Sequence, residues 1–123
     1  MSRIKHMIQS AVLACAKITA TANGAGIDIS AFAGDIKVTL DSSAGTGTTP
    51  TLDCKLEHSD DNSTFVAVVG GAFTQVTDAG PSYETLTLNA DGLKKYIRGV
   101  DTITGTTPEF SRSLSFVGEK QYS

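Results

Sequence analysis

Apolar and polar residues alternate in five short runs along the chain, and turn-forming residues bound each run. A period of two places successive side chains on opposite faces, so this pattern predicts antiparallel strands with one buried face. The clearest run places four residues on one predicted face: Leu52, Cys54, Leu56 and His58. A turn at 60–63 and a return strand that opens with Phe65 and Ala67 complete a predicted hairpin.

Four further strands are expected along the chain. They run over 36–40, over 83–88, from about Lys94 to Thr104 with an end at Gly105, and through a last segment with Phe110, Leu114 and Phe116. We expect exposed loops at 42–50 and 78–82, because neither segment holds a large apolar residue. A bulge or tight turn is predicted where two glycines stand together at 70–71.

The fold class that these elements predict is all-β, a single antiparallel β-sandwich (jelly-roll-like or Ig-like) or a barrel with an N-terminal arm. At 123 residues the chain fits one domain. Residues 1–22 are expected to form the arm and the first strand, which begins near Lys17, and residues 23–123 form the sandwich body. We find no sign of an internal repeat.

Charge and cysteine content exclude several classes of function. The net charge of −3 and the absence of a dense basic stripe argue against nucleic acid as a partner. Two cysteines, Cys15 and Cys54, are too few for a disulfide framework and lack the spacing of a zinc site. Cys54 is expected to be a small buried apolar residue.

The first residues resemble a short bacterial lipoprotein signal, with Arg3 and Lys5 before an apolar stretch that ends at Cys15. Gln9 and Ser10 interrupt that stretch, which barely reaches the length of about seven residues that such a region needs. We therefore expect no export and no membrane association. A surface lipoprotein or a carbohydrate-binding β-sandwich remains an alternative.

No set of residues predicts catalysis, a metal site or a cofactor. Only His6 and His58 are histidines, and the neighbours of His58 along its strand point to the opposite face, so no nucleophilic triad forms. The acidic turn at 60–62 lacks the glycine and glutamate of a calcium loop. Asp53 and Glu57 share a strand face and could line a sugar cleft. The expected answer is no enzyme, no metal and no cofactor.

Several pieces of the sequence, in this order, resemble small structural proteins of tailed bacteriophages, of the head decoration or cement type. The pieces are Gly26-Ile27-Asp28-Ile29 with Phe32, the run 36–40, the segment 56–65, the stretch 72–76, and Lys95-Tyr96-Ile97-Arg98 through 104–106.

The resemblance implies a virion component that is assembled in the cytoplasm of the bacterial host. Its partner would be the major capsid protein, and a head-tail or tail protein is the neighbouring alternative. The resemblance transfers no catalytic residue. A homo-oligomer is expected, with a trimer favoured, and contacts are expected first in residues 1–22 and in the loops at 42–50 and 78–82.

Overall fold

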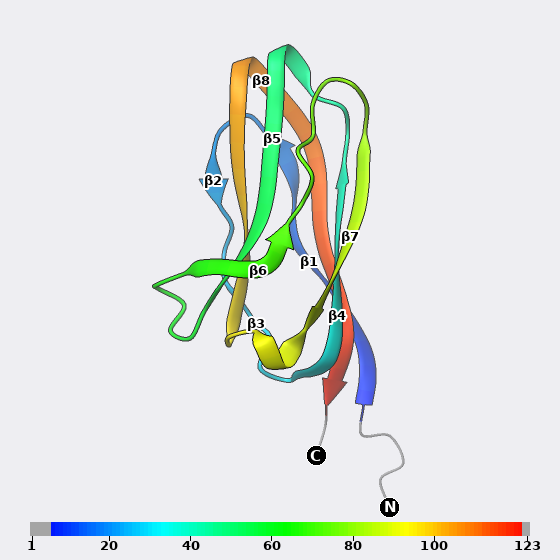
Figure 1. Ribbon diagram of the computed structural model, residues 1–123, viewed down its shortest axis with the longest axis vertical. Coiled ribbons are helices and arrows are strands. Elements are labelled where there is room, and N and C mark those ends of the chain that lie inside the picture. The colour runs from blue at the N-terminus through cyan, green and yellow to red at the C-terminus, as the bar shows by residue number, and fades with distance from the viewer. Residues whose placement is uncertain (1–5, 122–123) are drawn as a thin grey trace, which may run out of the picture.

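The computed structural model describes the backbone of residues 6–121 and the side chains of residues 17–118. Eight strands and one short 3₁₀ helix follow one another along the chain (Figure 1). Their bounds are β1 His6–Ile18, β2 Ala22–Asn23, β3 Ile27–Asp28, β4 Phe32–Ser42, β5 Thr46–Ser59, β6 Val66–Ala72, β7 Ser82–Asn89, η1 Ala90–Gly92 and β8 Tyr96–Gln121. The prediction of an all-β, antiparallel fold is confirmed.

The strands form two sheets packed face to face, and every pairing is antiparallel. In the first sheet, β1, the second half of β8, β4 and β7 lie side by side. In the second sheet, β2 and β3 pair with the first half of β8, which pairs in turn with β5, and β5 with β6. The two sheets are on the right and the left of Figure 1.

Strand β8 belongs to both sheets. Its residues 96–109 pair with β5 in the second sheet, and its residues 110–121 pair with β1 in the first. The sequence predicted two separate strands here, with an end at Gly105. That prediction is wrong, because the chain bends at Gly105 but keeps its pairing with β5 through the bend.

Three other boundaries differ from the predictions. Residues 42–50 are not a mobile loop, because β4 ends at Ser42 and β5 begins at Thr46. The first strand begins at His6 rather than near Lys17. The return strand of the predicted hairpin begins at Val66 rather than at Phe65, and its buried residue is Val68. The bulge at 70–71 is confirmed, since the register of β5 on β6 shifts there.

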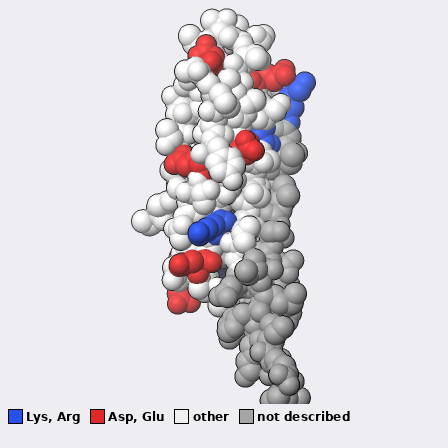
Figure 2. Space-filling model, turned by 90° about the vertical axis from the view of Figure 1, so that its right-hand side faces the viewer, with Lys and Arg blue, Asp and Glu red and all other residues white. Residues whose placement is uncertain are grey.

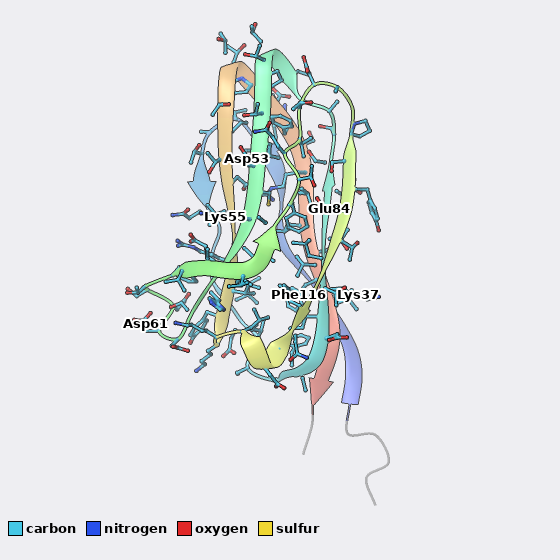
Figure 3. All side chains as sticks on the ribbon, in the orientation of Figure 1. Lys37, Asp53, Lys55, Asp61, Glu84 and Phe116 are labelled. Atoms are coloured by element: carbon cyan, nitrogen blue, oxygen red, sulfur yellow. The ribbon has the colours of Figure 1, made fainter. Side chains whose placement is uncertain are left out.

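The core lies between the sheets and is built from the inward residues of each strand. All four predicted inward residues of β5 are buried. The facing residues come mainly from β4 and β8: Ile36, Val38, Leu40, Phe110, Leu114 and Phe116. The Phe116 ring lies between the sheets (Figure 3) and meets Phe32 edge to face, with ring centroids 5.2 Å apart. Burial of these apolar side chains is the main force that holds the two sheets together.

One ion pair is buried inside this core. Asp101 lies in the half of β8 that belongs to the second sheet, and Arg112 lies in the half that belongs to the first. The guanidinium donates from Nε to Asp101 Oδ1 over 3.0 Å, and Nη2 donates to Oδ2. The side chain of Arg112 is 4% exposed and that of Asp101 is 3% exposed. Arg112 Nη1 has no hydrogen-bond partner among the described residues. The pair therefore joins the two sheets through two points on one strand.

We predict that Asp101→Ala lowers the free energy of unfolding by about 3 kcal/mol or more, because it leaves a buried guanidinium without its counter-ion. Chemical denaturation measures this change. The exposed pair between Lys17 Nζ and Glu109 Oε1, 3.3 Å apart, provides a control in Lys17→Gln, which should change stability little. The double variant Asp101→Leu/Arg112→Met should be more stable than Asp101→Ala. A double variant as unstable as the single one would contradict this account.

Candidate interaction surfaces

The outer face of the first sheet is rich in hydroxyl groups. Rows across β7, β4 and β8 follow the strand register, and one such row is Thr85, Thr39 and Ser115. The hydroxyls of Thr39 and Thr85 are 3.0 Å apart and share a hydrogen bond. We name this surface the hydroxyl face, defined by six residues: Thr39, Thr85, Thr87, Ser111, Ser113 and Ser115. Figure 2 shows this side of the molecule, where small, separate groups of charged atoms interrupt a mostly uncharged surface.

A five-residue sequence occurs twice at one end of the sandwich. Thr-Gly-Thr-Thr-Pro stands at 46–50 in β5 and again at 104–108 in β8. The expectation of no internal repeat is therefore wrong at this scale, and a comparison of the sequence with itself would have found it. The two copies run antiparallel with Thr48 opposite Thr106, so a local two-fold axis relates them. We name this pair of segments the threonine tip.

The two copies adopt the same unusual backbone conformation. Gly47 and Gly105 have φ of 109° and 120°, and Thr49 and Thr107 both have φ of 47°. A β-branched residue rarely adopts positive φ, because its Cβ crowds the following carbonyl. Both strands leave the regular register at this point. The repeated sequence thus encodes a matched pair of bulges that bends β5 and β8 together.

The threonine tip lies beside the connection that precedes β7. Gly45 N donates to Thr77 O over 3.0 Å, which brings the start of β5 next to residues 77–82. From the sequence we expected contacts in residues 1–22 and in the loops at 42–50 and 78–82. The structure brings the last two segments together at one end, whereas the described part of the first lies mostly in β1, paired along β8 in the first sheet. In Figure 1 that end is at the top, and the start of β1 and the end of β8 are at the bottom. Most tip residues are exposed and none is charged.

A groove of about 240 Å³ opens between β6 and η1. It is lined by His58, Val68, Val69, Leu88, Asn89, Gly92 and Leu93. Val69 is 96% exposed beside it. Among the described residues, β6 pairs only with β5, so the rim of the groove is a strand edge open to solvent. Open apolar edges are sites where another strand can add.

His58 is buried, at 9% exposure, as the sequence predicted for an inward residue of β5. Its Nδ1 accepts a hydrogen bond from the Lys94 backbone N–H over 3.2 Å. Burial lowers the pKa of the imidazole, the nearby Lys94 ammonium lowers it further, and Asp60 opposes both effects. The side chain of His6 lies outside the described residues.

The two carboxylates considered for a sugar cleft do share the outer face of β5, but both are engaged. Asp53 accepts two hydrogen bonds from Gln75 Nε2, at 3.2 and 3.0 Å. Glu57 Oε1 accepts from Arg98 Nε and Nη2, at 3.0 and 2.6 Å, and the same guanidinium stacks 4.0 Å from the centroid of the Phe65 ring. These contacts fix the outer surface of the second sheet.

The acidic turn after β5 is organised by one carboxylate. Asp61 Oδ1 accepts from the backbone N–H groups of Ser63 and Thr64, both at 2.9 Å, and from the Ser59 hydroxyl at 2.8 Å. The hydrogen bonds from the Thr64 backbone, Ser59 and the Ser63 backbone lower the pKa of Asp61 to about 2. The turn chemistry proposed from the sequence thus accounts for Asp61. Asp61 is labelled in Figure 3.

Cys54 is a free, buried thiol beside the ion pair. Burial raises its pKa to about 12, and the Asp101 carboxylate adds to the effect. A thiol with this pKa is inert near neutral pH. Cys15 lies opposite Ser113 in the register of β1, and its side chain lies outside the described residues. Within residues 17–118, no three His, Cys, Asp or Glu side chains form a group that could hold a metal.

No protein-family model matches this sequence, and no curated protein matches it significantly. Solved structures do share its fold. The SPBc2 prophage-derived protein YomS superposes with a TM-score of 0.53 at 14% identity, over 96% of this chain and 99% of YomS.

Two further structures have the same arrangement. A chain of Bacillus endospore appendages, described as a family of disulfide-linked pili, gives a TM-score of 0.56 at 14% identity over 100% of this chain and 96% of the other. A chain of the T13 particle of infectious bursal disease virus gives 0.58 at 10% identity over 99% of this chain and 37% of the viral one. At these identities the similarity establishes a shared fold.

In the described part of the chain, no helix is both long and apolar enough to cross a membrane.

The matched bulges of the threonine tip make a sharp prediction. A Cβ at Gly105 would lie 2.9 Å from the carbonyl oxygens of Thr48 and Thr49, on a backbone with φ of 120°. Gly105→Ala should therefore lower the free energy of unfolding by about 2 kcal/mol. Gly80→Ala is the matched control, because a Cβ there meets nothing within 4 Å. Urea unfolding of the two variants measures both changes, and equal stabilities would rule out the paired-bulge model.

Proposed function

We propose that this chain is a non-enzymatic structural protein of a tailed-phage virion, which binds the outside of the head shell and stabilises it as a decoration or cement protein. The observation that supports the proposal most is the surface itself. The sandwich presents the hydroxyl face, an uncharged tip and open strand edges, and its buried polar groups serve the fold. The resemblance in sequence and the fold shared with a prophage-derived protein and with a virus particle chain agree with this role.

We infer that the threonine tip, together with residues 77–82, is the part that contacts the major capsid protein. The tip itself is uncharged, so it loses little solvation energy when covered, and its matched bulges hold the exposed hydroxyls in fixed positions. The adjoining residues 77–82 carry one charge, at the exposed Asp78. A single copy held through this small surface binds weakly. Many copies on a shell lattice resist expansion together, because each shell subunit is held through several neighbours.

Oligomeric state belongs to the same proposal. A trimer seated on the three-fold positions of the shell would match the symmetry of the lattice. A head-tail or tail protein of the virion is the second candidate, and it uses the same adhesive surfaces at a different place in the particle. In either role the protein is assembled in the cytoplasm of the host and needs no cofactor or nucleic acid.

The proposal predicts that the chain is a stoichiometric component of purified virions of the phage or prophage that encodes it. Quantitative mass spectrometry of particles separated into heads and tails measures its copy number in each fraction. Hundreds of copies per head support decoration, and about a dozen copies or fewer, found with the tail or neck, indicate the second candidate. Absence from both fractions, or lipid on a mature Cys15, would reject a virion role.

The contact site predicts a second result. Thr48→Lys/Thr106→Lys places two ammonium groups on the tip, and both positions are exposed. We expect binding of this variant to shells that lack the protein to fall at least about tenfold, because each buried ammonium must be desolvated. Thr85→Lys/Thr87→Lys is the matched control on the hydroxyl face. If the control loses binding and the tip variant keeps it, the hydroxyl face is the contact site instead.

A further inference from the structure

The connection from β7 to β8 is tied to the rest of the sandwich by few polar contacts. It consists of residues 90–95 and includes η1. The Lys95 carbonyl accepts from Ile29 N over 2.8 Å, and the Lys94 N–H donates to His58 Nδ1 over 3.2 Å. The Lys94 ammonium lies 3.7 Å from Asp60 Oδ2 in an exposed ion pair. His58 thus supplies the contact between this connection and the buried face of β5.

This hydrogen bond exists in one protonation state of the imidazole only. Nδ1 accepts the Lys94 N–H, so in the native protein it carries no proton, and the ring proton of the neutral form is on Nε2. When both nitrogens are protonated, each is a donor, and Nδ1 faces another donor. The contact then changes from attractive to repulsive.

The surroundings of His58 favour the neutral form. Val68 of β6, Leu88 of β7 and Leu93 line the groove beside it and offer no charge. The charged groups that act on the ring are the Lys94 ammonium, which opposes protonation, and the Asp60 carboxylate, which favours it. Glu57 precedes His58 on β5, and its side chain projects to the opposite face of the strand.

We propose that His58 is an acid-sensitive latch: protonation of its imidazole breaks the hydrogen bond to Lys94 and releases the connection 90–95, so that the groove between β6 and η1 widens. The released segment carries Leu93, which packs against the core in the latched state. Acid therefore exposes apolar surface next to Val69, at the open edge of β6. The latch stands independently of the virion role.

The sign of the stability change follows from the pKa. The native imidazole has a pKa below its ordinary value of 6.5, so the unfolded chain binds protons more readily than the native one. The contribution of neutral His58 to the free energy of unfolding is complete above pH 6.5, and it is lost as the pH falls from 6.5 through the pKa of the native imidazole. It does not fall further below that value.

Nuclear magnetic resonance of the whole chain tests the latch. The His58 ring and the Lys94 amide should titrate together, with one midpoint below pH 6.5. Protection of the Lys94 amide against hydrogen exchange, corrected for the intrinsic rate, should fall at least about fivefold below that midpoint. His6→Ala removes the other histidine and should leave both curves unchanged. Separate midpoints for the ring and the amide would overturn the proposal.

Two substitutions at the latch separate its chemistry from simple packing. His58→Asn keeps an acceptor oxygen near the position of Nδ1 and has no proton to gain, so Lys94 should stay protected down to pH 4.5. His58→Leu fills the site but accepts nothing, so the Lys94 amide should exchange rapidly at every pH. A pH step that persists in His58→Asn contradicts the latch.

Variants of the two neighbouring charges keep the histidine in place and answer the question even if a His58 variant does not fold. Lys94→Gln retains the backbone donor and removes the repelling cation, so the midpoint should move up toward 6.5. Asp60→Asn removes the attracting carboxylate and should move the midpoint down. Midpoints that stay unchanged in both variants would contradict the proposal, because they would show that neither charge acts on the His58 ring.

Discussion

The structure depends on one strand that serves two sheets. Because β8 runs through both, its two halves must face each other across the core, and the Asp101–Arg112 pair holds them there. Apolar packing alone has no direction and would permit the halves to slide. A bidentate pair fixes their relative position, because any displacement leaves a charge buried without its partner. The other strands add to one half of β8 or the other, or to each other outside it.

A repeated five-residue sequence allows β8 to bend without losing its partner strand. The same five residues stand in β5 and β8, so both strands bulge at the same point and stay paired through the bend. A bend in one strand alone would break the ladder there and leave polar backbone groups open. This arrangement produces a threonine tip without charged residues, and the proposed contact with the shell uses the part of the molecule where both strands must bend together.

Much of the fold could be predicted from the sequence because apolar and polar residues alternate with a period of two in a half-buried strand. Leu52 to His58 show it plainly, and all four inward residues are buried. The continuity of β8 could not be predicted this way, since Gly105 and Pro108 indicate an end unless the partner strand is known to bend with them. Similarly, 42–50 has no large aliphatic or aromatic residue, yet backbone pairing and the burial of Ser42 and Pro50 hold it. His58 was predicted to be buried, but its bond to Lys94 joins positions 36 apart and leaves no local pattern.

Electron cryomicroscopy of intact virions tests the central claim most directly, that the chain acts by adhesion through one rigid end. The account predicts density for the sandwich on the outside of the head, with the threonine tip against the shell and the opposite end of the sandwich, where β1 begins and β8 ends, directed outward. Virions that contain the chain but seat it with that opposite end against the shell, or virions without such density on the head, neck or tail, would contradict it.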